Sequence, residues 1–181
     1  MKPLKYIPQY TYEDYCQWEG NWELIDGLPY AMSPSPIRKH QRMGGVVFFA
    51  LENALSNNRQ KCATCVAIYE TDWVISPDTI VRPDLAIVCT NEGEFIKTAP
   101  VVVVEILSPS TAMKDRIIKK DIYEREQVPY YIIIDPEKRI LQILVWKHSG
   151  YEEDNDLKRF DIHGQCSIEF DLAEVVKQAV L

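Results

Sequence analysis

Long hydrophobic runs are absent from this 181-residue sequence. No stretch reaches the ~18 apolar residues that a membrane-spanning helix requires. The first six residues, Met1 to Tyr6, lack the apolar core of a secretory signal peptide. We therefore expect a protein that does not enter the membrane and that resides in the cytoplasm.

Cysteine is present in an odd number, five. An odd number makes a disulfide framework unexpected and fits a reducing compartment. Cys62 and Cys65 have the spacing of a CxxC motif, but no second Cys or His pair follows at zinc-finger spacing. The sequence therefore argues against zinc binding or redox chemistry at this motif.

An excess of positive charge is also missing, since the formal net charge is −7. This charge argues against a protein that coats nucleic acid through bulk electrostatics, but not against an enzyme with a local basic groove. Basic residues do cluster, in the two groups Arg38, Lys39, Arg42 and Lys114, Arg116, Lys119, Lys120. No phosphate-binding loop of the G-x-x-x-x-G-K-[ST] type occurs, so ATP use is unsupported.

A run of four valines, Val101 to Val104, leads directly into Glu105. Such a run is typical of a strand covered on both faces, where a lone ionised carboxylate would be costly. Asp84 follows Pro83, a residue that tends to mark the start or edge of a strand. Two carboxylates that converge there would suit Mg²⁺ or Mn²⁺. The alternative is that Asp84 caps a turn and Glu105 pairs with an arginine.

The rest of the chain alternates between short strands and helices. Asp26-Gly27 predicts a hairpin over 22–32, and Thr11 with Asp14 predicts a short capped helix before it. Ser33 to Pro36 should end the hairpin and start a helix over 37–56. The other predicted elements are strands at 65–70, 73–75, 85–89, 101–107, 130–135 and 140–147, a helix from Ser110 or Thr111 to about 127, a polar acidic loop, and a last helix over 172–180 capped by Asp171. This mixture predicts an α/β domain with a mixed sheet.

Asp115, Lys119 and Tyr123 are spaced four residues apart on the helix after Glu105, so they share one face. A lysine beside two acids can orient an attacking water or neutralise charge on a phosphate. The alternative is an ordinary solvated ion pair, and the spacing alone favours that alternative.

Several short motifs occur in a fixed order along the chain. They are Glu23-Leu24-Ile25-Asp26-Gly27, Met32 to Pro36 with His40, Arg82-Pro83-Asp84-Leu85, Val104 to Thr111, Asp115-Arg116-x-x-Lys119-x-x-x-Tyr123, and Ile133-Ile134-Asp135-Pro136. This ordered set resembles the Uma2 family of endonucleases, formerly DUF820, within the PD-(D/E)XK nuclease superfamily. The resemblance covers roughly residues 12 to 146.

The resemblance implies a restriction-endonuclease-like core with a mixed central β-sheet flanked by helices. The chain would form one domain over 1–181, with its core at about 12–147 and a C-terminal strand and helix at about 165–181. It implies a metal site from Asp84 and Glu105. The lysine of the superfamily normally lies two residues after the second acid, where this chain has Leu107. Lys119 would replace it from the helix, with Lys120 as the alternative.

The resemblance also implies roles for residues outside this pair of acids. Glu23 resembles the additional acid that holds a second ion or a metal-bound water; the alternative is a polar residue on an exposed strand face. His40 matches the histidine of the family, and a structural role is the alternative. Tyr123 would pack beside the site, and Asp135 would end a strand.

The function that we expect is metal-dependent hydrolysis of phosphodiester bonds in DNA, with Mg²⁺ or Mn²⁺ as cofactor. Asp84, Glu105, Lys119 and Glu23 would be the catalytic residues. The candidate nucleic-acid contacts are Arg38, Lys39, His40, Lys114 and Arg116. Two alternatives stay open: a catalytically inactive nuclease fold that serves as a binding or assembly module, and a hydrolase of another phosphate ester. A homodimer is plausible because one domain offers limited surface to a duplex.

Overall fold

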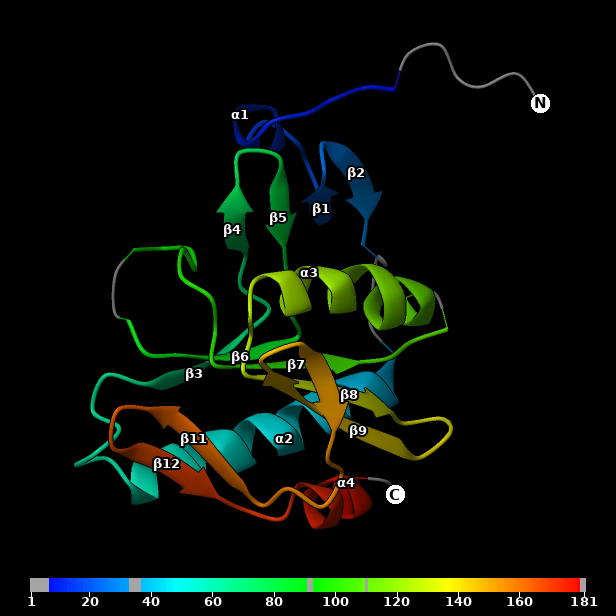
Figure 1. The fold of residues 1–181 in the computed structure, drawn as a ribbon. Coiled ribbons are helices and arrows are strands. Elements are labelled where there is room, and N and C mark those ends of the chain that lie inside the picture. The colour runs from blue at the N-terminus through cyan, green and yellow to red at the C-terminus, as the bar shows by residue number, and fades with distance from the viewer. Residues whose placement is uncertain (1–6, 33–36, 91–92, 110, 180–181) are drawn as a thin grey trace.

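The protein is built around a six-stranded mixed sheet (Figure 1). A computed structural model describes residues 7–32, 37–90, 93–109 and 111–179. The strand order is β10-β9-β8-β7-β6-β3, in which β7 and β8 run parallel and the other neighbours are antiparallel. The strands are β3 (Val66–Tyr69), β6 (Leu85–Val88), β7 (Val102–Ile106), β8 (Tyr130–Asp135), β9 (Ile140–Lys147) and β10 (Gly150–Glu153). The predicted α/β class with a mixed central sheet is confirmed.

Helices cover both faces of this sheet, as Figure 1 shows. The long helix α2 (Arg38–Asn57) lies on one face, and a π-helical segment η1 (Lys114–Lys119) with α3 (Lys120–Arg125) lies on the other. Along β7, Val102, Val104 and Ile106 join the core on the α2 side, whereas Val103 joins the core on the α3 side. The valine run is therefore buried on both faces, as predicted, and the alternation places Glu105 on the α3 side.

A second, antiparallel sheet contains the N-terminal hairpin. Its order is β2-β1-β5-β4, from β1 (Trp22–Ile25), β2 (Leu28–Ala31), β4 (Trp73–Ser76) and β5 (Thr79–Val81). Asp26 and Gly27 both have positive φ, 49° and 74°, as a tight hairpin turn demands. The predicted capping box is present at helix α1 (Tyr12–Tyr15), where Thr11 and Asp14 exchange hydrogen bonds. The prediction that Ser33 to Pro36 end the hairpin and start the next helix falls outside the described residues.

The predicted polar acidic loop after β9 is limited to residues 154–158, and the prediction is wrong for the strands on either side of them. That region contains β10 and then β11 (Arg159–His163), which pairs with β12 (Cys166–Glu169) before helix α4 (Leu172–Ala179). In β11 the buried residues Phe160 and Ile162 alternate with exposed polar ones. This short alternation is obscured by the acidic residues that precede it. Asp171 caps α4 as predicted, because its Oδ1 accepts the Glu174 amide at 3.0 Å.

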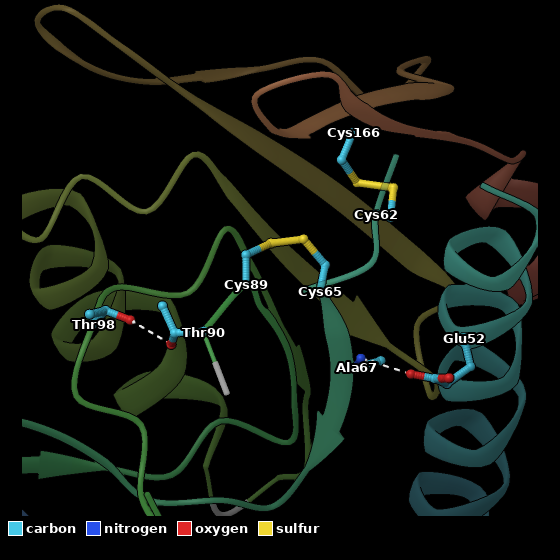
Figure 2. Close-up of a disulfide and its surroundings, with 8 residues drawn as sticks. All are labelled: Glu52, Cys62, Cys65, Ala67, Cys89, Thr90, Thr98 and Cys166. Atoms are coloured by element: carbon cyan, nitrogen blue, oxygen red, sulfur yellow. Dashed lines mark hydrogen bonds between the residues drawn. A yellow bond between two sulfur atoms is a disulfide. The ribbon is translucent and has the colours of Figure 1, made fainter. Parts of the chain in front are cut away.

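The expectation of no disulfide is also wrong. Cys62 is bonded to Cys166, and Cys65 to Cys89 (Figure 2). Antiparallel pairing of β3 with β6 places Cys65 beside Cys89, at a Cα–Cα distance of 3.9 Å. Cys16 is the free, exposed fifth cysteine, so an odd number is compatible with two bridges. The CxxC cysteines thus serve separate bridges, and the cysteine count no longer supports a reducing compartment.

Within the described ranges, no helix is both long enough and apolar enough to cross a bilayer. The cytoplasmic location stays a prediction.

Candidate active site

Glu105 lies near the C-terminal end of β7 and is 2% exposed. Its Oε1 accepts hydrogen bonds from Lys119 Nζ and from the Tyr123 hydroxyl, each at 2.8 Å. Burial raises the pKa of this carboxyl well above its usual value; Lys119 opposes the shift, and neighbouring carboxylates, with Asp115 first among them, add to it. Glu105 is therefore a buried acid whose negative charge is only partly compensated by the protein.

Asp84 is held at the same end of β7. It follows β5 and Pro83 and directly precedes β6, and its Oδ2 accepts the backbone N–H of Ile106 at 2.7 Å. Because Ile106 is the residue after Glu105, this bond fixes the first acid beside the second. His40 Nε2, from the first turn of α2, lies 3.2 Å from the same oxygen of Asp84. The two acids converge as predicted, and Glu105 pairs with a lysine rather than with an arginine.

Lys119 is 2% exposed and occupies the centre of an acidic cluster that consists of four carboxylates, Glu23, Asp84, Glu105 and Asp115. Its Nζ lies 2.8 Å from Oε1 of Glu105, 2.8 Å from Oε1 of Glu23 and 3.1 Å from the Arg82 carbonyl oxygen. Although burial alone would lower the pKa of Lys119, the surrounding carboxylates raise it well above its usual value. An ammonium has three N–H donors, and all three have acceptors here. The raised pKa favours the charged form of Lys119.

The helix that carries Lys119 has a wider turn than predicted. Lys114–Lys119 is π-helical, a form that often occurs at functional sites. Asp115 and Lys119 are both buried in this segment, and Asp115 Oδ1 lies 3.8 Å from Lys119 Nζ. The solvated ion pair that the spacing alone favoured is thus replaced by a buried one. Lys120, the alternative lysine, is partly exposed and has no ion pair with any described residue.

Glu23 comes from the other sheet and is fully buried. Its Oε1 accepts the Arg82 backbone N–H at 2.9 Å as well as Lys119, and its Oε2 pairs with Lys114. Burial raises the pKa of Glu23, but Lys119 and Lys114 outweigh burial and leave the pKa lowered. The alternative of an exposed strand residue is therefore wrong, and Glu23 is an ionised acid with both oxygens engaged.

Sequence reasoning did not find the residues that hold Arg82 in place. The Arg82 guanidinium donates to Asp72 Oδ1 at 2.6 Å, to Asn21 Oδ1 at 2.9 Å and to the Tyr15 hydroxyl at 3.4 Å. The backbone of Arg82 in turn donates to Glu23 and accepts from Lys119. Arg82 therefore connects α1 and the second sheet to the acidic cluster. The only sequence signal was its position two residues before Asp84.

Several of the residues predicted to contact nucleic acid pair with acidic side chains of the protein. Lys114 pairs with Glu23, and His40 with Asp84. Lys39 lies 3.0 Å from Glu137 in an exposed ion pair. Of the five predicted contacts, only Arg38 has no ion pair with the residues that the structure describes.

Arg116 lies near β8 and β9 and is only partly exposed. It donates to Gln142 Oε1 at 2.6 Å, and its other terminal nitrogen lies 3.7 Å from Asp135. Asp135 itself ends β8 and accepts two backbone amides in the turn that follows, which is the strand-end role predicted for it.

A hard divalent cation such as Mg²⁺ needs oxygen ligands that are free to bind it. Asp84 Oδ1 and Glu105 Oε2 accept no hydrogen bond from the described residues, while the second oxygen of each acid is engaged. Mg²⁺ is commonly held by one or two carboxylates together with water. No group of three or more His, Cys, Asp or Glu side chains in the described ranges is arranged to hold a metal ion. The site therefore fits a Mg²⁺ ion that is held by two carboxylates and water, and not one that is held by protein ligands alone.

Comparison with known families bears directly on these residues. A family model described as "Uma2: Putative restriction endonuclease" matches residues 11–164, a span that includes all four residues of the acidic cluster. The chain belongs to the Uma2 family. A solved Uma2-like structure, a putative nuclease of DUF820 from Anabaena variabilis, has a TM-score of 0.69 at 15% identity, covering 94% of this chain and 99% of that one. It shows a shared fold. No curated protein matches this chain.

Leu107 occupies the position at which the sequence resemblance leads us to expect a lysine, and the structure shows what that residue does. Leu107 is 3% exposed and belongs to the apolar core that includes Ile122 and Tyr123. The lysine that contacts Glu105 is Lys119, which comes from η1.

Proposed function

We propose that this Uma2 protein is a metal-dependent endonuclease that hydrolyses phosphodiester bonds in DNA. One observation carries the proposal: Lys119 Nζ lies within hydrogen-bond distance of Glu23 and Glu105, while Asp84 is bonded to the residue after Glu105. Two acids with a buried lysine are a set that can support metal-dependent phosphodiester hydrolysis, and family membership supports the same interpretation.

Asp84 and Glu105 would hold Mg²⁺ or Mn²⁺ through the oxygens that accept no hydrogen bond from the described chain. When bound, the ion would make its water more acidic and polarise a phosphoryl oxygen. The raised pKa of Glu105 agrees with this assignment, because a carboxylate surrounded by other carboxylates gains from an added cation.

In this proposal Lys119 does not transfer a proton. Its raised pKa keeps it charged, so it stabilises negative charge near the phosphate and fixes the orientation of Glu105. Tyr123 shares the second task through its hydroxyl, and Glu23 balances the charge of Lys119.

The DNA backbone would be held by basic side chains near α2, with Arg38 and Lys39 as the exposed candidates. Such contacts position a nucleic acid without reading its sequence. We also propose that the protein binds DNA as a homodimer. Light scattering of the protein with a duplex would test this.

The decisive experiment measures nicking of supercoiled plasmid with Mg²⁺, with Mn²⁺ and with EDTA. Wild type should cleave only with metal, Asp84→Asn and Glu105→Gln should lose cleavage, and Lys120→Met should cleave like wild type. Lys120→Met is matched because it removes the neighbouring lysine, which lies outside the acidic cluster. Circular dichroism of each variant shows that it is folded.

Other outcomes would replace the proposal. Equal cleavage by wild type and both acid variants would identify a contaminant. Binding of DNA without metal-stimulated cleavage would favour the inactive binding module. Hydrolysis of a small phosphodiester without DNA cleavage would favour a hydrolase of another phosphate ester.

A further inference from the structure

A pocket with a volume of about 460 Å³ lies beside the N-terminal end of α2. Its walls come from three places: the first turns of α2, the turn between β8 and β9, and the end of α4. Figure 1 shows these segments together at the lower right of the molecule, on the α2 side of the sheet. The pocket does not include any of the four residues of the acidic cluster.

Arginines dominate the charge of this pocket. Arg38, Arg42 and Arg139 all line it, and none of them has an ion pair with the residues that the structure describes. The remaining charged residues, Lys39 and Glu137, pair with each other across the wall at 3.0 Å. In a chain with a net charge of −7, three arginines without an ion pair to any described residue form a concentrated positive site around one pocket.

The backbone around the pocket is held in place by short-range bonds. Asp135 Oδ1 accepts the amides of Glu137 and Lys138 at 3.1 and 2.9 Å, which fixes the β8–β9 turn. Arg139 ends that turn with a φ of 57°, a conformation that turns the chain sharply into β9. Met43, 1% exposed, forms part of the apolar wall. The arginines are thus mounted on ordered elements.

A phosphate is the group that best matches these donors. Guanidinium groups bind phosphate through paired, charge-assisted hydrogen bonds. The 20-residue helix α2 begins after Ile37, whose side chain cannot cap it, and it has no acidic residue in its first turn. The positive end of the helix dipole at that end adds a second attraction for an anion.

The pocket and the acidic cluster lie on opposite sides of the first turns of α2. His40 contacts Asp84, and residues two positions apart on an α-helix point about 200° away from each other. Arg38 and Arg42 are each two residues from His40, so they face away from the bond that would be cleaved.

We propose that Arg38, Arg42 and Arg139 bind a backbone phosphate of the nucleic acid at a position away from the cleaved bond. The identity of the ligand rests on the proposed function, whereas the phosphate-binding chemistry rests on the pocket alone. These arginines are binding residues that anchor one end of the substrate. His40, which contacts Asp84, lies on the opposite side of the same helix.

The test measures the affinity for a fluorescent 20-bp duplex by anisotropy, without divalent metal and over a range of NaCl concentrations. Arg42→Gln and Arg139→Gln should each weaken binding about three- to tenfold, and each should reduce the salt dependence by about one counterion. Arg59→Gln is the matched control, because Arg59 is exposed, has no ion pair within the described chain, and lies beyond the opposite end of α2.

A second arm uses inorganic phosphate and follows amide NMR signals of the β8–β9 turn and the first turns of α2. Shifts at these amides, lost in the Arg42→Gln/Arg139→Gln double variant, support the pocket. Phosphate binding without any effect of the variants on DNA affinity would overturn the nucleic-acid role and indicate a small phosphorylated ligand. No effect in either arm would overturn the pocket itself.

Failure of the proposed function gives a different pattern. If wild type cleaves no DNA but binds it, and Arg42→Gln and Arg139→Gln bind it more weakly, the phosphate pocket stands while the endonuclease proposal does not.

Discussion

Lys119 Nζ lies 2.8 Å from a carboxylate oxygen of Glu105 and 2.8 Å from a carboxylate oxygen of Glu23. The two acids come from different sheets, so this one ammonium connects the N-terminal sheet to the centre of the main sheet. Both acids are almost fully buried, and each depends on Lys119 for compensation of its charge.

Substitution of Lys119 by Met should therefore destabilise the protein strongly. Removal of one partner from a buried ion pair typically costs about 3–5 kcal/mol, because the remaining charge is left uncompensated. We expect a loss of this order in urea unfolding, and less than about 0.5 kcal/mol for the neighbouring Lys120→Met. Equal stability of the two variants would show that Glu23 and Glu105 do not depend on Lys119.

The lowered pKa of Glu23 makes a prediction about pH. A carboxyl whose pKa is lower in the folded state contributes stability above its ordinary pKa of 4.5, and that contribution is lost as the pH falls through the lowered value. Glu23→Gln should thus be less stable than wild type at pH 7, and the difference should shrink below pH 4.5. Glu105 has the opposite shift, and because the charge of Glu23 contributes to it, the pKa of Glu105 should fall in Glu23→Gln. A difference that is constant with pH would contradict an ionised Glu23.

Asp72 should act on catalysis through Arg82 although it does not touch the acids. Asp72→Asn weakens the 2.6 Å contact that holds the Arg82 guanidinium, and the Arg82 backbone bonds both Glu23 and Lys119. We expect about a tenfold fall in the cleavage rate, since a small misplacement of a positioned group is costly. DNA affinity should be unchanged. Asp121→Asn, on the exposed side of α3, should cleave like wild type.

The two disulfides predict a specific thiol count and a specific loss of stability. In denaturant without reductant, one thiol per chain, that of Cys16, should react with a thiol reagent. Reduction of the Cys62–Cys166 bridge, which spans 104 residues, should cost about 2–5 kcal/mol. Cys16→Ser should leave the stability unchanged. Reaction of all five thiols without reductant would contradict both bridges.

The central part of the site could be predicted from sequence because its signals are local. Only the Uma2 resemblance places Lys119 at the site, since its spacing alone favours a solvated ion pair. The valine run, in contrast, places Glu105 in a buried strand, and Pro83 places Asp84 at the start of a strand. These are consequences of strand and helix periodicity, which short segments reveal without tertiary information.

The remainder depends on contacts between distant segments. The burial of Glu23 follows from its bond to Arg82, 59 residues away, and cannot be read from a four-residue strand. The disulfides follow from the pairing of β3 with β6 and from the position of β12, neither of which the cysteine count reveals. The wide turn of η1 likewise follows from packing, because it buries two charged residues that an exposed helix would leave in water.

Cleavage of supercoiled plasmid DNA by wild type and by Glu105→Gln, purified in parallel and assayed with Mg²⁺ and with EDTA, tests the central claim most directly. We expect metal-dependent nicking by wild type and a loss of at least about a hundredfold in the variant. Nicking by folded Glu105→Gln at the wild-type rate would contradict the assignment of Glu105 to the reaction centre.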